Sequence, residues 1–138
     1  MKLMNLTLTL ALLMSSQPAK ASDEIIVVAN LAEPAGTMQK HEVRNLFMGG
    51  ASSGLEPVTL VPGAQTRLIF NARIVGLTES RIQSYWAQMR FSGRNKAPVQ
   101  VQSVDAMMEY LLENQGSVGY LPADVTLPET LTVLYISG

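Results

Sequence analysis

Along the chain, short apolar runs alternate with stretches in which apolar residues recur every three or four positions. The first run, Ile25–Ala29, is rich in β-branched residues, which is typical of a strand covered on both faces. Further strands are predicted at residues 58–61, 99–101, 118–121 and 132–136. Because strands alternate with helical patterns, we expect an α/β fold with a mostly parallel central sheet flanked by helices.

Helices are predicted at residues 38–47, 65–75, 78–90 and 104–112, with Thr37, Thr78 and Ser103 as N-caps of three of them. In the third helix the apolar residues are spaced at i, i+3, i+4 and i+7, so one stripe should face the core. The stripe comprises Ile82, Tyr85, Trp86 and Met89, and that of the fourth helix comprises Val104, Met107, Met108, Leu111 and Leu112. The residues expected to be buried include Phe47, Phe70, Trp86 and Val118.

The N-terminus has the three parts of a secretory signal peptide. Lys2 precedes an apolar run at residues 6–14, and Ala19-Lys20-Ala21 forms a small-x-small cleavage pattern. The alternative is a membrane anchor, but the run is much shorter than the about 20 residues that span a bilayer. We therefore expect a signal peptide at 1–21 and one mature, periplasmic domain at 22–138.

Composition narrows the classes of function. The chain of 138 residues has 10 basic and 11 acidic residues, and cleavage would remove two lysines and leave a net charge of about −3. An acidic domain without a basic run is a poor candidate for nucleic acid. Without Cys, and with His41 as the single histidine, no metal site or cofactor is expected. Dispersed carboxylates and the lack of a Gly-x-Ser-x-Gly elbow argue against an enzyme.

Three segments occur in a characteristic order: residues 42–50 (EVRNLFMGG), 67–70 (RLIF) and 116–120 (GSVGY). In order and spacing they resemble the phosphate-type periplasmic solute-binding proteins of bacterial ABC transporters, over about residues 37–121. The resemblance implies a single lobe of the periplasmic-binding-protein type, located in the periplasm, with phosphate or a similar small oxyanion as its ligand.

In that family a Ser-Gly-Thr turn opens a helix and holds the anion through backbone N–H groups and hydroxyls, with an arginine on the preceding strand. Here the three turn positions fall on Ala64, Gln65 and Thr66, so only the threonine is retained, and the strand arginine is missing. By resemblance, the candidate ligand-binding residues are Gly63, Gln65, Thr66 and Arg67. An arginine in the first helical turn could either offer charge to a ligand or point to solvent.

Two functions remain open. The family closes two lobes around its anion, and most of the first lobe is missing here, so a single lobe should bind phosphate only weakly and present it to an inner-membrane transporter or sensor. Alternatively, the lobe has lost its ligand and acts as a structural or interaction module in an envelope complex. Arg90, Arg94 and Lys96 form either a basic rim or a solvated helix end.

Overall fold

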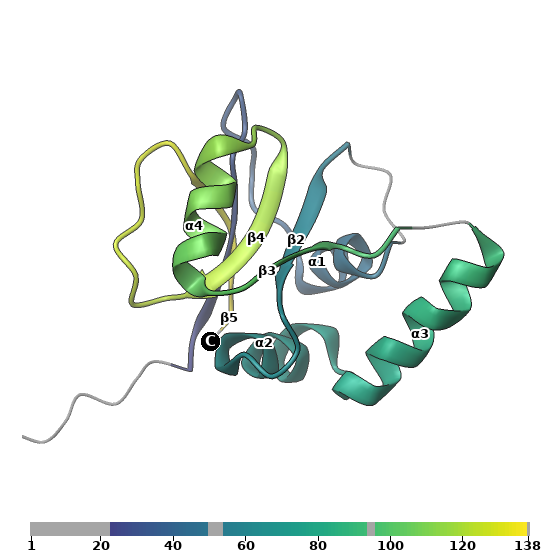
Figure 1. Ribbon diagram of the computed structural model, residues 1–138. Coiled ribbons are helices and arrows are strands. Elements are labelled where there is room, and N and C mark those ends of the chain that lie inside the picture. The colour runs from purple at the N-terminus through teal and green to yellow at the C-terminus, as the bar shows by residue number, and fades with distance from the viewer. Residues whose placement is uncertain (1–22, 50–53, 94–95, 138) are drawn as a thin grey trace, which may run out of the picture.

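The computed structural model describes residues 23–49, 54–93 and 96–137, which form a five-stranded sheet with helices on both faces (Figure 1). The strands are β1 (Ile25–Ala29), β2 (Glu56–Leu60), β3 (Val99–Val101), β4 (Ser117–Pro122) and β5 (Thr132–Ser137). The helices are α1 (Lys40–Phe47), α2 (Gln65–Phe70), α3 (Glu79–Ser92) and α4 (Val104–Glu113), and α2 continues as the π-helix η1 (Asn71–Val75). The predicted signal peptide and Arg94 lie outside the described residues.

The strands are ordered β3-β2-β4-β1-β5. β2 pairs in parallel with β3 and β4, whereas β1 is antiparallel to both β4 and β5. β1 therefore runs against the other four strands, and the expectation of a mostly parallel sheet is confirmed with this one exception. All five residues of β1 are buried, as its unbroken apolar run predicts.

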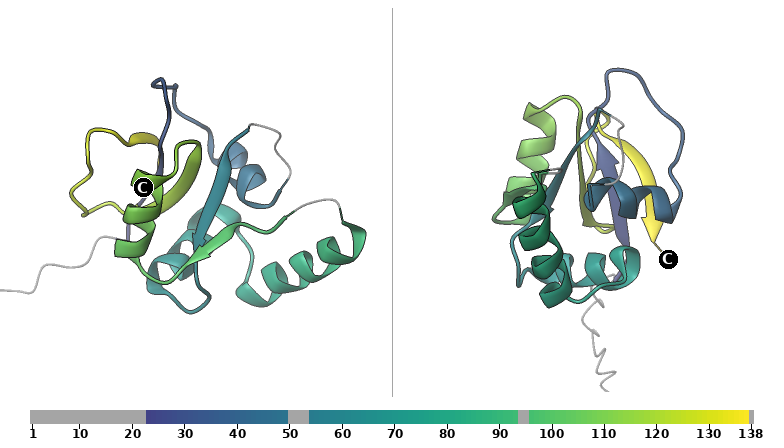
Figure 2. Two further views of the ribbon diagram at one scale, coloured as in Figure 1. Left: turned by 45° about the horizontal axis from the view of Figure 1, so that its top comes forward. Right: turned by 90° about the vertical axis from the view of Figure 1, so that its right-hand side faces the viewer.

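Successive residues of β4 show how the helices cover the two faces. A β-carbon on Gly119 would lie 2.5 Å from Sδ of Met107 in α4, so this glycine allows α4 to approach the sheet closely. The next residue, Tyr120, points to the opposite face, where its ring stacks on Phe70 of α2 at 3.9 Å and lies 5.8 Å from Phe47 of α1. Figure 2 shows α4 and α1 on opposite sides of the strands.

The helix caps follow local sequence rules in two of three cases. Thr78 and Ser103 accept hydrogen bonds from the backbone N–H groups three residues later, at 3.3 and 3.0 Å, as predicted. The predicted Thr37 cap was wrong, because α1 begins only at Lys40. Its N-cap is Gln39, whose N–H donates to Oε1 of Glu42 at 3.0 Å, and this bond fixes the start of the helix.

The predicted core residues Phe47, Phe70, Trp86 and Val118 are all buried. Leu112 is the exception to the predicted stripes, since 43% of it is exposed. It follows the fully buried Leu111, and one helical step turns it off the face that packs on the sheet. The apolar pattern thus identified the packing face of α4 but drew it one residue too wide.

Candidate functional site

The turn between β2 and α2 contains the residues expected to bind a ligand. Gly63 has φ +90°, a conformation that favours glycine, and both Gly63 and Gln65 are exposed while Thr66 is half-buried. Gln65, Thr66 and Arg67 are the first three residues of α2, so their backbone N–H groups have no acceptor within the helix. The N-cap is Ala64, which offers no side-chain acceptor. The first turn of α2 therefore has backbone donors that the helix itself leaves without acceptors.

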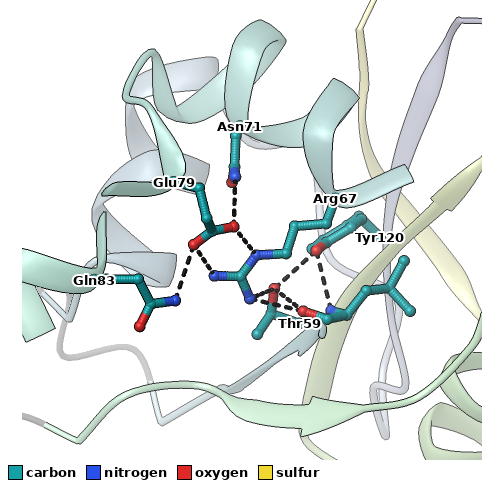
Figure 3. A network of polar contacts seen from close by, with 7 residues as sticks. Thr59, Arg67, Asn71, Glu79, Gln83 and Tyr120 are labelled. Atoms are coloured by element: carbon teal, nitrogen blue, oxygen red, sulfur yellow. Dashed lines mark hydrogen bonds and ion pairs between the residues drawn. The ribbon is translucent and has the colours of Figure 1, made fainter. Parts of the chain in front are cut away.

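The side chain of Arg67 leaves this turn and points into the protein, where only 4% of the residue is exposed. Its Nε and Nη2 donate to Oε1 and Oε2 of Glu79 at 2.6 and 2.7 Å, and its Nη1 donates to the carbonyl oxygen of Leu60 at 2.7 Å (Figure 3). This two-pronged contact matches the planar guanidinium to the planar carboxylate. The positive charge of Arg67 is therefore already compensated within the protein.

The end of β2 explains why an arginine is buried here. The β2–β4 pairing is registered at Glu56 and Pro57 and does not extend to Leu60. The backbone groups of Leu60 are instead satisfied by side chains: its N–H donates to Oη of Tyr120 at 3.1 Å, and its carbonyl accepts from Arg67. Tyr120 also shares a hydrogen bond of 2.8 Å with Oγ1 of Thr59. Arg67 and Tyr120 thus supply hydrogen-bond partners to the backbone of Leu60 at the end of β2, because buried backbone groups require partners.

Glu79 is the acceptor that joins α2, η1 and α3. Besides Arg67, its carboxylate accepts from Nδ2 of Asn71 at 3.3 Å and from Nε2 of Gln83 at 3.0 Å. The hydrogen bond from Arg67 is the main reason that the pKa of Glu79 lies below its usual value. Thr59, Glu79 and Tyr120 were not identified from the sequence, because their partners are close only in the folded chain.

A pocket of about 220 Å³ lies beside this network, between α3 and the strands β2 and β3. Arg67 and Asn71 form part of its wall, while Gly63, Gln65 and Thr66 do not. The structure therefore separates the four candidate residues. Gly63, Gln65 and Thr66 lie in the turn, outside the pocket, whereas Arg67 lines the pocket.

The remaining candidates are on the surface. His41, Arg90 and Lys96 are exposed. Within the described ranges, no three His, Cys, Asp or Glu residues are grouped so that they could hold a metal ion. No helix in this part of the chain is long and apolar enough to cross a membrane.

Comparison with known proteins gives a likeness in structure. No family model and no curated protein matches the sequence. An ABC-type phosphate transport receptor from Vibrio cholerae has a TM-score of 0.58 and 15% identity, covering 82% of this chain and 47% of that protein. A putative phosphate ABC transporter substrate-binding protein with bound phosphate, from Clostridium perfringens, has a TM-score of 0.64 and 12% identity, covering 83% and 45%.

These likenesses confirm the predicted fold, a short lobe like that of periplasmic binding proteins. At such low identity they show the fold alone. The chain spans slightly less than half the length of the two proteins. The ligand, the partners and the location of this chain are therefore not shown by these comparisons.

Proposed function

We propose that the chain is a small solute-binding lobe that holds phosphate or a similar oxyanion weakly at the β2–α2 turn. The observation that carries the proposal is the fold shared with two proteins of phosphate transport, one of which has phosphate bound. The contacts would be the backbone N–H groups of Gln65, Thr66 and Arg67 and the hydroxyl of Thr66, with Gly63 shaping the turn.

In this proposal the chain is not an enzyme and uses no cofactor. The segment 1–21 directs export, and the domain 22–138 works in the periplasm. There it presents the anion to a transporter or sensor of the inner membrane.

The affinity for the anion should be low because the turn offers it the dipoles of backbone N–H groups, while the side chain of Arg67 is already paired with Glu79. Glu79 compensates the guanidinium of Arg67, and the exposed turn leaves part of the anion in water. We expect a dissociation constant in the millimolar range, which corresponds to a free energy of binding of about −4 kcal/mol. An anion at ten times that concentration would add only about 1.4 kcal/mol to the free energy of unfolding.

Thermal melts in phosphate, sulfate and chloride at matched ionic strength test the proposal, and phosphate should stabilise more than chloride does. The most direct test is the variant Gln65→Pro, which removes one of the backbone N–H groups proposed to contact the anion. Proline is tolerated at the first position of a helix, and Ala64 before it has φ −63° and ψ 133°, which a following proline permits.

Gln65→Pro and Thr66→Ala should each reduce the extra effect of phosphate, whereas Thr130→Ala, at an exposed position outside the turn, should not. Equal shifts with all three anions, unchanged in both turn variants, would contradict the proposal.

That result would favour the second candidate, a structural or interaction module without a ligand. One observation supports it: the positive charge nearest to the turn is committed to Glu79 and Leu60. Arg67 therefore stabilises the fold and has no free charge to offer to an anion.

A further inference from the structure

The pocket between α3 and the sheet has mainly apolar walls. Five buried side chains from α1, α2, η1 and α3 contribute to it, and none is more than 8% exposed. They are Phe47, Phe70, Val75, Ile82 and Trp86. An apolar enclosure with a few polar groups is the usual form of a site for a small organic molecule.

The polar side chains of the pocket differ in whether they already form hydrogen bonds or ion pairs within the protein. Arg67 and Asn71 donate to Glu79, and Gln83 commits its amide nitrogen to the same carboxylate. Arg90, on the last turn of α3, also lines the pocket but forms no ion pair with any residue that the structure describes. Among the described residues that line the pocket, Arg90 is therefore the charged group without an ionic partner, and its charge is positive.

The volume limits the size of a ligand. The pocket measures about 220 Å³, which corresponds to roughly seven water molecules at about 30 Å³ each. A free phosphate would suit the apolar walls poorly, because its oxygens would face carbon atoms and lose hydrogen bonds. A molecule of about ten non-hydrogen atoms with an apolar body and one negative group fits the volume and the charge.

We propose that this pocket binds a small organic carboxylate, aromatic or branched, whose apolar body packs against Trp86 and Phe70 and whose carboxylate meets Arg90. The site and the ligand class are distinct from those proposed for the β2–α2 turn. Gly63, Gln65 and Thr66 do not line the pocket, so either proposal can fail without the other.

The single tryptophan of the chain is Trp86, so its fluorescence reports on this pocket directly. The probes are benzoate, phenylacetate and isovalerate, with benzyl alcohol as a neutral compound of similar size. We expect saturable changes with at least one of the acids in the millimolar range and about tenfold weaker binding of the alcohol, equivalent to one charge-assisted contact.

Two variants locate the charge. Arg90→Gln should weaken binding of the acid about tenfold while leaving the alcohol unaffected, because only the acid uses the guanidinium. Arg81 is an exposed arginine of the same helix that does not line the pocket, so Arg81→Gln should leave the binding of both the acid and the alcohol unchanged. Both positions are exposed, so both variants should fold.

A third variant, Ala97→Phe, places a ring at the pocket wall and should abolish binding of acid and alcohol alike. The proposal is overturned if none of the three acids gives a saturable change, or if Arg90→Gln binds them as well as the unaltered protein does. Phosphate should leave the fluorescence of Trp86 unchanged even where it raises the melting temperature.

Discussion

Replacing Glu79 with alanine should destabilise the protein strongly, although Glu79 is not a core residue. The change removes the acceptor of four hydrogen bonds and leaves the guanidinium of Arg67 buried, with Nε and Nη2 unpaired. Breaking a buried ion pair by removing one partner costs about 3 to 5 kcal/mol. The side chain of Glu79 is 25% exposed, so water can reach part of the vacated space. We therefore expect a loss of about 2 to 4 kcal/mol, a large share of a small domain's stability.

Urea unfolding, followed by the fluorescence of Trp86 and by far-ultraviolet circular dichroism, measures this loss. The midpoint should fall while the slope stays constant, since the surface exposed on unfolding hardly changes. Glu109→Ala, at an exposed position in α4, is the matched control and should shift the free energy of unfolding by less than about 0.5 kcal/mol.

A double-mutant cycle separates the pair from its surroundings. In an Arg67→Met background, removing Glu79 no longer leaves a buried charge, so Glu79→Ala should cost much less there than in the unaltered protein. If Glu79→Ala has the same small effect as Glu109→Ala, the pair behaves like an exposed salt bridge, and the reasoning from burial is refuted.

The dependence on pH gives an independent check of the same contact. The pKa of Glu79 is lower in the folded protein than its usual value of 4.5, mainly because of the hydrogen bond from Arg67. The stabilisation is therefore complete above the unfolded pKa and is lost as the pH falls through the folded pKa. The difference in stability between the unaltered protein and Glu79→Gln should be constant near neutral pH and shrink below about pH 4.5.

Three further predictions concern other parts of the chain. Gly119→Ala should cost about 1 to 3 kcal/mol in urea unfolding, because the new β-carbon would lie 2.5 Å from the sulfur of the fully buried Met107; an unchanged midpoint would mean that the side chain of Met107 moves aside. Tyr120→Phe should cost about 1 to 3 kcal/mol, because the N–H of Leu60 loses its acceptor; a loss below about 0.5 kcal/mol would show that another acceptor replaces the hydroxyl. Mass spectrometry of exported protein should find a chain that begins at or next to Ser22, and recovery of the full-length chain from membranes would indicate an anchor instead.

Local rules account for the parts of the fold that the sequence predicted. Thr78 and Ser103 cap their helices through contacts with residues three positions away, and Ile25–Ala29 forms a buried strand because its whole length is apolar. The direction of this strand was not predictable, since it depends on where β1 enters the sheet relative to β4 and β5. Sequence patterns determine which residues are buried more readily than how strands are paired.

The path of the Arg67 side chain could not be predicted for a related reason. Its partner Glu79 lies twelve residues further along, beyond the π-helix and the left-handed Gly76 that redirect the chain. No helical or strand periodicity connects these positions. The other partner, the carbonyl of Leu60, needs Arg67 because β2 and β4 separate before the strand ends, which is a property of the sheet as a whole.

The position of Arg67 also limits how an anion could be held at the turn. To reach a ligand there, the guanidinium would have to leave Glu79 and the carbonyl of Leu60. Among the described residues, the carbonyl would keep only the 3.4 Å hydrogen bond from Oγ1 of Thr59. Losing the bond from the charged guanidinium costs about 1.5 to 3 kcal/mol, and separating the ion pair adds to this. Millimolar binding supplies only about 4 kcal/mol in total. An anion at this turn is therefore best held by the backbone N–H groups at the start of α2 and by the hydroxyl of Thr66, while the side chain of Arg67 stays with Glu79.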